Sequence, residues 1–305
     1  MHMSTPMRET SRFFRATVAR VTDLTPSFRR FTFTGPDLDQ YGDTGWDQRV
    51  KLVFPSRSVG IDAMPTGPDW FSAWRALDEA RRPPFRTYTT RAVRHAEREV
   101  DIDMVVHEVQ GPASAWIQRA RPGDDVLIFA PTTAHDGIGS GIDFVPPARV
   151  EDFLLAGDET AAPAIAVILE QLPATARGVV AVEVPEGADR SYLPSHPGFE
   201  LDVSARGDGE RHARLIRSVT EIAAERLPDG RGAQVEEIDI DTQLLWEVPR
   251  TAKGGAALTS APLYAWLAGE ASGIKTLRRH LVADHGVDRR AVAFMGYWRQ
   301  GRAEV

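Results

Sequence analysis

The sequence predicts two domains, an antiparallel β-barrel followed by a doubly wound α/β sheet. The chain has 305 residues, and a single hydrophobic core rarely grows beyond about 250 to 300 residues. Residues 14–129 consist mainly of short strand-like runs, whereas strand-like and helix-like segments alternate beyond residue 150. A glycine-rich stretch at 135–143 and the pair Pro146-Pro147 separate the two patterns. We therefore expect one domain over residues 12–146 and the other over residues 149–305.

The first half of the chain contains the short apolar runs expected of a barrel, bounded by Pro, Gly or charged residues. Two of them flank a polar turn and predict a hairpin, and a short helix begins with proline in its first turn and stops before Pro122-Gly123. The predicted strands are 14–21, 28–34, 49–54, 86–93, 99–107 and 125–129, and the predicted helix is 112–120.

The second half alternates between buried strands and amphipathic or apolar helices, which is typical of βαβ units. Two similar acidic turns, at 157–160 and 269–272, come directly after strands. The predicted strands are 152–155, 178–184, 199–204, 233–240, 263–267 and 291–297, and the predicted helices are 161–172, 212–223 and 274–283.

Composition excludes several kinds of protein. There is no cysteine, so disulfides, thiol nucleophiles, cysteine-ligated zinc and a resident iron-sulfur cluster are ruled out, and any electron transfer requires an organic cofactor. A net charge of −7 argues against a general nucleic-acid or anionic-membrane surface. No stretch reaches about 18 uncharged apolar residues, and the first six residues lack the apolar core of a signal peptide. We expect a cytoplasmic monomer that binds neither nucleic acid nor membranes stably.

The first group of residues with chemical potential is the run Arg86 to Arg91. In a strand, Arg86, Tyr88 and Thr90 face one way, and Thr87, Thr89 and Arg91 face the other. An aromatic ring flanked by a cation and hydroxyls suits a planar, phosphorylated ligand. The alternative is an ordinary amphipathic strand with surface arginines.

The second group lies where the short helix begins. Gly111 and Pro112 precede Ser114, and a helix N-terminus offers unpaired N–H groups to a pyrophosphate. The alternative is that Gly111 and Pro112 only start the helix.

The third group comprises the two acidic turns, which fall where open α/β sheets bind ligands. Asp158, Glu159 and Thr160 form one turn, and Gly269 and Glu270 begin the other. These carboxylates can hydrogen-bond a ribose or an amide, or Asp158 and Thr160 can simply cap the helix. No dinucleotide glycine fingerprint or Walker motif is present.

The fourth group, Tyr297, Trp298 and Arg299, follows the last buried strand. Large aromatic residues at a chain end usually pack onto something. A flat cofactor and plain packing at a domain interface both remain open.

Together these groups make the chain resemble the siderophore-interacting protein family of flavin-dependent ferric-siderophore reductases. The resemblance extends from Phe14 to Gly301. The motifs that carry it are Lys51-Leu52-Val53-Phe54-Pro55, the 86–91 run, Gly111-Pro112-Ala113-Ser114, Ala156-Gly157-Asp158-Glu159-Thr160, Ala268-Gly269-Glu270-Ala271 and Gly296-Tyr297-Trp298-Arg299-Gln300-Gly301.

The resemblance implies a ferredoxin-reductase-like architecture, with a six-stranded antiparallel Greek-key barrel for FAD and a doubly wound domain for NAD(P)H. It implies that Arg86 binds the flavin phosphates, that Tyr88 stacks on the isoalloxazine, and that Thr89 lies near the reactive ring edge. Lys51 and Arg299 become candidates to attract an anionic ferric chelate. The full implied cofactor-binding set is Arg86, Thr87, Tyr88, Thr89, Thr90, Arg91, Asp103, His107, Gly111, Ala113, Ser114, Thr132, Thr133, Asp158, Glu159, Thr160, Gly269, Glu270, Tyr297, Trp298 and Arg299. No metal ligands are expected.

The implied reaction is hydride transfer from NAD(P)H to FAD, followed by one-electron transfer to Fe(III) in a siderophore. The chain departs from the family pattern at Thr132-Thr133-Ala134, where a basic residue and glycine are common, and after His107, where glycines are usual. A flavin electron transferase with a protein redox partner and a non-catalytic siderophore-binding flavoprotein remain alternatives. Four cations could contact a 2′-phosphate of the nucleotide: Arg190, Arg206, Arg211 and Lys275.

Overall fold

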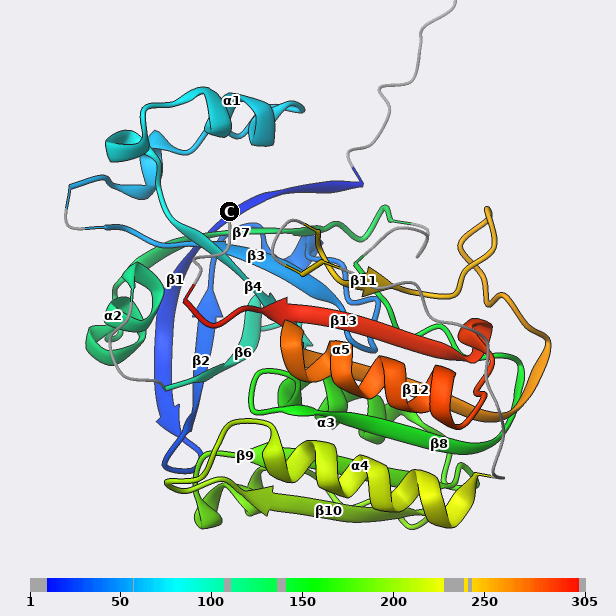
Figure 1. The fold of residues 1–305 in the computed structure, drawn as a ribbon. Helices are drawn as coiled ribbons and strands as arrows, with labels where there is room; N and C mark the ends of the chain where they lie inside the picture. The colour runs from blue at the N-terminus through cyan, green and yellow to red at the C-terminus, as the bar shows by residue number, and fades with distance from the viewer. Residues whose placement is uncertain are drawn as a thin grey trace, which may run out of the picture. The chain divides into compact units, whose positions relative to one another are not determined.

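The computed structural model describes residues 10–56, 58–106, 111–135, 141–227, 239–240 and 243–301. The chain divides into two compact units, with the division between Gly141 and Ile142 (Figure 1). Residues 24–28, at the turn of the first hairpin, group with the second unit. Within the described ranges, no helix combines the length and the apolar character needed to span a membrane.

The first unit contains a seven-stranded sheet in the order β4-β3-β7-β1-β2-β6-β5. Pairing is antiparallel between β1 and both β2 and β7, between β3 and both β4 and β7, and between β5 and β6. The strands are β1 (Ser11–Asp23), β2 (Phe28–Thr34), β3 (Arg49–Val53), β4 (Phe85–Thr89), β5 (Ala92–Arg94), β6 (Glu99–Val105) and β7 (Asp125–Pro131). The helices are α1 (Trp70–Ala76) and α2 (Pro112–Arg119).

The expected count of six strands is wrong, because the predicted strand 86–93 is interrupted. The N–H of Thr90 donates to the carbonyl of Gln48, whereas the N–H of Arg91 donates to the carbonyl of Asp101, both at 2.9 Å. The chain thus leaves the β3 side of the sheet and joins the β6 side within two residues. Since β4 and β5 form the two edges of the sheet, this short link requires the sheet to curl until its edges approach each other.

Two apolar clusters stabilise the first unit. The larger joins side chains of β1, β2, β3, β6 and β7 with Trp116 and Ile117 of α2. The second joins Trp70 and Trp74 of α1 to Phe85 of β4 and Leu127 of β7. The helix α1 was not predicted, because its two tryptophans give too short a pattern for a confident helical period.

The second unit contains a six-stranded sheet in the order β10-β9-β8-β12-β13-β11. Its strands run parallel except for β11, which pairs antiparallel with β13. The strands are β8 (Arg149–Asp158), β9 (Gly178–Val184), β10 (Phe199–Ala205), β11 (Trp246–Glu247), β12 (Ser260–Glu270) and β13 (Val292–Trp298), and the helices are α3 (Ala162–Gln171), α4 (Ala213–Arg226) and α5 (Ala271–Arg279).

Helices cover both faces of this sheet. Helices α4 and α5 lie on one face, where their apolar side chains form a common core with β8, β12 and β13, and α3 lies on the other (Figure 1). The strand β11 was not predicted, and most of the predicted strand 233–240 lies outside the described residues. The helix predicted at 274–283 begins earlier, at Ala271, because Glu270 caps it.

The order of strands creates a topological switch point between β8 and β12. The chain passes from β8 outward to β9 and β10, then returns to β12 on the other side of β8. Ligands of open α/β sheets bind outside the carboxyl ends of the strands at such a point. Here β8 ends at Asp158 and β12 ends at Glu270, so the two predicted acidic turns meet at the switch point.

Candidate functional site

Strand β4 presents Arg86 and Tyr88 on one face. Their cross-strand partners are Leu52 and Val50, both members of the barrel core. The ring of Tyr88 packs edge-to-face against Phe54, with centroids 6.1 Å apart. Half-buried Arg86 donates one hydrogen bond, from Nη1 to the carbonyl of the residue before it. Among the described residues its other guanidinium N–H groups have no partner, so they are available to a phosphate.

Thr90 differs from these two, because its hydroxyl is buried. It lies 2.8 Å from the hydroxyl of Tyr41 and accepts a hydrogen bond from Gln48 Nε2 at 3.3 Å. Burial raises the pKa of Tyr41 well above its ordinary range. The main chain of Tyr41 also forms a β-bridge with buried Thr132, whose hydroxyl accepts from the N–H of Ala134. Tyr41 thus connects the end of β7, through its main chain, to the strand junction, through its hydroxyl.

Lys51 lies on the opposite face of β3 and β4 from Arg86 and Tyr88. Its Nζ is 3.4 Å from the hydroxyl of Thr87 and 5.1 Å from the ring centroid of Phe85. Thr89 lies on the same face of β4 as Thr87 and is buried. The structure therefore separates Lys51 and Thr87 from the Arg86 and Tyr88 face.

Asp103 belongs to an ion-pair cluster. Its side chain has no exposed surface, accepts two hydrogen bonds from Arg30 at 2.7 and 2.8 Å, and lies 3.5 Å from Arg91 Nε. Two strand positions earlier, burial raises the pKa of Asp101, but hydrogen bonds from Arg94 and Thr32, together with the charges of Arg94 and Arg30, outweigh burial and lower it. The geometry assigns Asp103 the role of orienting two arginines.

The start of α2 is closed by its own residues. The hydroxyl of Ser114 accepts from the N–H of Gly111 and donates to its carbonyl, both at 3.0 Å. A β-carbon added at Gly111 would meet nothing within 4 Å, so space is open on that side. Ala113 is buried, Thr133 is exposed at the end of β7, and His107 lies outside the described residues.

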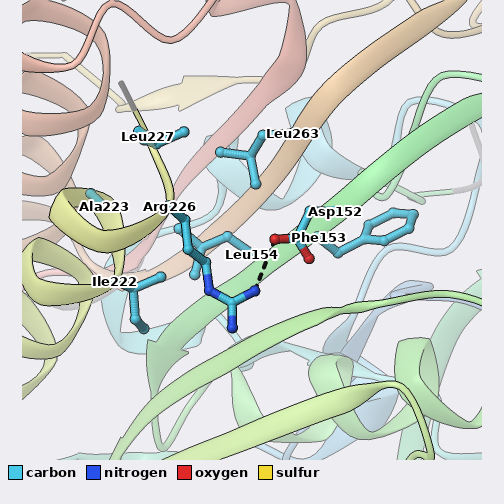
Figure 2. Close-up of a pocket in the computed structure, with 8 residues that line it drawn as sticks. All are labelled: Asp152, Phe153, Leu154, Ile222, Ala223, Arg226, Leu227 and Leu263. Carbon is cyan, nitrogen blue, oxygen red and sulfur yellow. Dashed lines mark hydrogen bonds and ion pairs between the residues drawn. The ribbon is translucent and has the colours of Figure 1, made fainter. Parts of the chain in front are cut away.

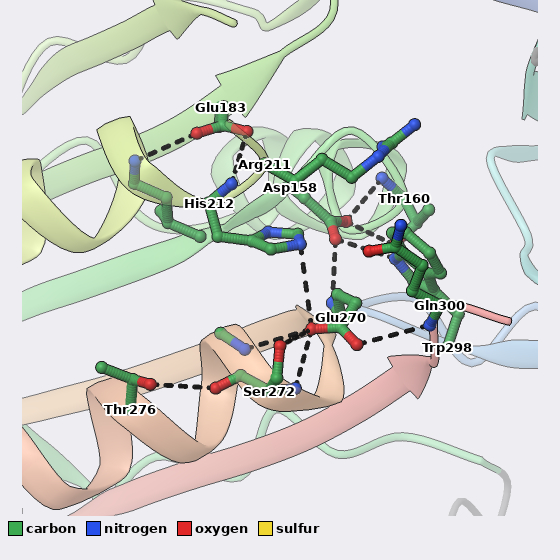
Figure 3. Close-up of polar contacts among 12 residues, drawn as sticks. Asp158, Thr160, Glu183, Arg211, His212, Glu270, Ser272, Thr276, Trp298 and Gln300 are labelled. Atoms are coloured by element: carbon green, nitrogen blue, oxygen red, sulfur yellow. Dashed lines mark hydrogen bonds and ion pairs between the residues drawn. The ribbon is translucent and has the colours of Figure 1, made fainter. Parts of the chain in front are cut away.

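At the switch point of the second unit, Asp158 is fully buried and accepts four hydrogen bonds (Figure 3). Its Oδ1 accepts from the N–H of Thr160 at 2.9 Å and from its hydroxyl at 2.5 Å. Its Oδ2 accepts from the N–H of Glu270 and from Trp298 Nε1, both at 2.8 Å. Burial raises the pKa of Asp158 and the charge of Glu159 raises it further, whereas Thr160 and Trp298 oppose the shift. Asp158 thus joins the ends of β8, β12 and β13.

Glu159 is also fully buried and is held by two arginines. Arg206 donates to both of its oxygens at 3.1 Å and also to Glu183 at 3.2 Å. Burial lowers the pKa of Arg206, but its bonds to Glu159 and Glu183 raise it above the ordinary value. Arg211 donates to Glu159 at 3.1 Å and lies over the ring of Trp298 at 5.5 Å. Of the four cations considered for a 2′-phosphate, Arg206 and Arg211 are therefore both engaged by carboxylates.

Glu270 is the N-terminal cap of α5. Its Oε2 accepts from the N–H groups of Ser272 and Gly273, at 2.8 and 3.2 Å. Burial raises the pKa of Glu270, but hydrogen bonds from the Ser272 hydroxyl and from the N–H groups of Gly273, Ser272 and Gln300 together outweigh burial and lower it. Gly269 has φ of +151°, and a β-carbon there would lie 2.8 Å from Asp158 Oδ2. Only glycine fits this position without strain.

The terminal aromatic residues pack within the second unit. Tyr297 stacks on Trp246 of β11, with centroids 5.6 Å apart and planes 18° apart. Arg299 donates to the carbonyl of Ile240 at 2.8 Å.

Two buried residues of the site were not predicted from the sequence. Glu183 of β9 accepts from the N–H groups of His212, Arg214 and Leu215 at the start of α4. A single charge within the apolar run 178–184 was its sequence signal. His212 is 6% exposed, and neither ring nitrogen has a hydrogen-bond partner in the described structure. Its sequence context gave no signal.

A small apolar hollow, with a cavity volume of about 10 Å³, lies elsewhere in this unit (Figure 2). Its lining includes Leu154, Leu263 and Leu227, and Arg226 forms an ion pair with Asp152 at 2.9 Å beside it. These residues belong to the early parts of β8 and β12, so the hollow is remote from the switch point. In the described ranges no cluster of acidic, histidine or cysteine side chains is suited to a metal ion.

The side chains of each unit are suited to one organic ligand. In the first unit, the available N–H groups of Arg86 and the partly buried ring of Tyr88 suit the phosphate and the flat ring of FAD. In the second unit, the buried unpartnered imidazole at the switch point suits a polar ligand.

Comparison with known proteins gives a consistent result. Residues 17–135 match the family profile described as siderophore-interacting FAD-binding domain, and residues 150–301 match the profile described as siderophore-interacting protein. The NADPH-dependent ferric-chelate reductase of Escherichia coli is 31% identical over 216 residues, 69% of this chain and 78% of that protein. The ferric vibriobactin reductase ViuB of Vibrio cholerae is 27% identical over 275 residues, 90% of this chain and 85% of that protein.

Solved structures agree. The siderophore-interacting protein SipS from Aeromonas hydrophila superposes with a TM-score of 0.67 and 28% identity, covering 97% of this chain and 94% of that chain. The ferredoxin reductase of carbazole 1,9a-dioxygenase has a TM-score of 0.58 at 12% identity, covering 96% of this chain and 71% of that chain. The second match concerns the fold alone, which is ferredoxin-reductase-like.

Proposed function

The chain belongs to the siderophore-interacting protein family, and from this premise we propose that it is an NAD(P)H-dependent, FAD-containing ferric-siderophore reductase. The observation that carries the proposal is the match of each half of the chain to its own family profile, with reductases aligned across both halves. When bound, FAD would supply the redox chemistry that links the two substrates, because a flavin can take up two electrons together and release them singly.

In the first unit, Arg86 and Tyr88 hold the flavin. They share one face of β4, so one ligand can contact both side chains. The guanidinium of Arg86 neutralises phosphate charge, and the ring of Tyr88 offers a flat apolar surface. Asp103 positions Arg91 beside this strand. The hydroxyl of Ser114 and the N–H of Gly111 are engaged with each other, so we assign the pyrophosphate to the main-chain N–H groups in the first turn of α2.

In the second unit, the switch point between β8 and β12 receives the nicotinamide dinucleotide. Asp158, Glu159 and Glu270 shape this site rather than donate to the ligand, because partners within the chain occupy most of their acceptor sites. Their buried network holds the ends of three parallel strands in one arrangement.

The substrate is a ferric siderophore, an anionic chelate for which local cations matter more than a net charge of −7. Lys51 and Arg299 remain the proposed cations. In this proposal the chain acts in the cytoplasm and as a monomer.

The test is an anaerobic two-stage titration of the FAD-loaded protein. In the first stage, NADPH or NADH is expected to bleach the yellow flavin absorbance. In the second, a ferric siderophore restores the absorbance while a ferrous-specific chelator reports about two Fe(II) per NAD(P)H consumed, as electron balance requires. Free FAD at the same concentration is the control.

The two stages separate the alternatives. Failure of both nucleotides to bleach the flavin would rule out the reductase and favour a non-catalytic flavoprotein. Bleaching that no ferric siderophore reverses would favour an electron transferase with a protein partner.

A further inference from the structure

His212 occupies an unusual position at the switch point. It precedes α4 with φ of +65°, a left-handed conformation that a non-glycine residue adopts at a cost. Its N–H donates to Glu183 at 2.9 Å, which fixes the backbone there. The ring packs over Gly273, where a β-carbon would lie 3.0 Å from its Cγ. The fold thus holds this imidazole in one place.

The imidazole has unused hydrogen-bonding capacity. Its side chain is 8% exposed, yet both ring nitrogens lack a hydrogen-bond partner; Glu270 Oε2 lies 3.8 Å from Nε2, which is an ion-pair contact only when the ring is protonated (Figure 3). Other described histidines with a buried unpartnered nitrogen, such as His196, have only one. A buried donor or acceptor left unsatisfied is costly. A ligand that supplies the missing partners removes this cost.

The surroundings decide which chemistry suits His212. The N-terminal amides of α4 and α5 are already occupied by Glu183 and Glu270, and Asp158 accepts from the N–H of Thr160 ahead of α3. Such N–H groups at helix N-termini are the usual phosphate ligands of α/β sheets. Four buried carboxylates also outnumber the two arginines among them, Arg206 and Arg211. The region therefore disfavours a phosphate.

An imidazole offers an N–H donor and, when it is neutral, an acceptor nitrogen as well. It therefore complements an uncharged ligand group that likewise both donates and accepts. A nicotinamide dinucleotide carries two such groups, the carboxamide and the ribose hydroxyls. The acidic surroundings also favour the nicotinamide end, whose ring is cationic in the oxidised form.

We propose that His212 is a binding residue for the nicotinamide riboside end of the dinucleotide, hydrogen-bonding its uncharged polar groups while the phosphates lie outside this carboxylate cluster. The assignment rests on the proposed function, in that it takes the nucleotide site to be real. It adds a binding residue to that site and gives the orientation of the dinucleotide, with the nicotinamide end at His212.

The test measures binding rather than turnover. Calorimetric titration of the FAD-loaded protein with NAD⁺ compares wild type with His212→Gly and His212→Asn, both of which tolerate a left-handed backbone. We expect about tenfold weaker binding in each, since one to two hydrogen bonds are lost. The matched control His196→Asn replaces a buried histidine near the start of β10, at the other end of the sheet, and is expected to leave affinity within about twofold. Thermal unfolding of all variants checks folding.

A second ligand shows whether His212 forms its hydrogen bonds with the carboxamide or with the ribose. The analogue with an acetyl group in place of the carboxamide keeps the ribose and lacks the amide N–H. If His212 contacts the carboxamide, wild type discriminates against the analogue and His212→Gly does not. If it contacts the ribose, His212→Gly weakens both ligands equally.

The outcomes are separable from those of the proposed function. A wild-type protein that binds neither NAD⁺ nor NADP⁺ and is not bleached by NADH or NADPH would overturn the proposed function. Wild-type binding with unchanged affinity in both folded His212 variants would overturn only the inference. Competition of NAD⁺ by inorganic phosphate in wild type that disappears in His212→Gly would also overturn it, because the residue would then bind a phosphate.

Discussion

Replacing Arg206 by methionine should destabilise the second unit far more than the same replacement at Arg211. Both arginines donate to Glu159, but Arg206 makes three bonds of 3.1 to 3.2 Å to two carboxylates with no exposed surface. Its own side chain is 8% exposed, against 35% for Arg211. Removing one partner of a buried ion pair costs about 3–5 kcal/mol, whereas a partly exposed pair contributes about 0–1 kcal/mol.

For a domain of this size, about 1 kcal/mol corresponds to roughly 2–4 °C in Tm. Arg206→Met should therefore lower the transition of the second unit by roughly 10 °C, and Arg211→Met by no more than about 4 °C. Differential scanning calorimetry can follow separate transitions in a chain of two units. Hydrogen exchange of peptides covering Glu183 and the start of α4 assigns the loss to this network. Equal shifts for the two variants, or a loss confined to the first unit, would show that the buried network does not stabilise the fold as argued.

Three further predictions concern other parts of the molecule. Gly269→Ala should destabilise the second unit by about 2–4 kcal/mol, since φ is +151° and the new carbon would lie 2.8 Å from a buried carboxylate oxygen; chemical denaturation should show no comparable loss for Gly111→Ala, where space is open. Because the pKa of Glu270 is lowered in the folded protein, the ionised carboxylate stabilises the fold at pH values above its ordinary pKa of 4.5, and this stabilisation is lost as the pH falls through the lower folded pKa. Glu270→Gln should therefore flatten this part of the pH dependence of the unfolding free energy, measured by denaturation at successive pH values. Tyr88→Ala should release FAD on gel filtration, whereas Thr87→Ala, on the other face of β4, should retain it; equal retention would refute the proposed stacking role.

The architecture could be predicted because its signals are local. Short apolar runs between turn residues gave the barrel strands, and strand-helix alternation gave the doubly wound sheet. The break at Thr90 and Arg91 gave no such signal. Alternation along the sequence continues through it, and only the change of hydrogen-bond partner from Gln48 to Asp101 reveals two strands. Strand number therefore depended on long-range pairing.

The site was predicted in part for the same reason. Two acidic turns at strand ends identified Asp158 and Glu270, because parallel strands bring their carboxyl ends to one edge. Sequence could not tell that Arg206 is buried while Arg211 is partly exposed, since both fall in one polar segment. His212 was missed because its partner Glu183 lies 29 positions away.

The junction at Thr90 and Arg91 has a mechanical consequence. In most open sheets an edge strand can detach alone, which exposes unpaired N–H and C=O groups to other chains. Here the two edges, β4 and β5, are consecutive segments joined by two residues. Peeling one away pulls on the other, so neither edge frays independently. One of these two edges, β4, carries Arg86 and Tyr88, so loss of flavin should accompany any opening of the barrel.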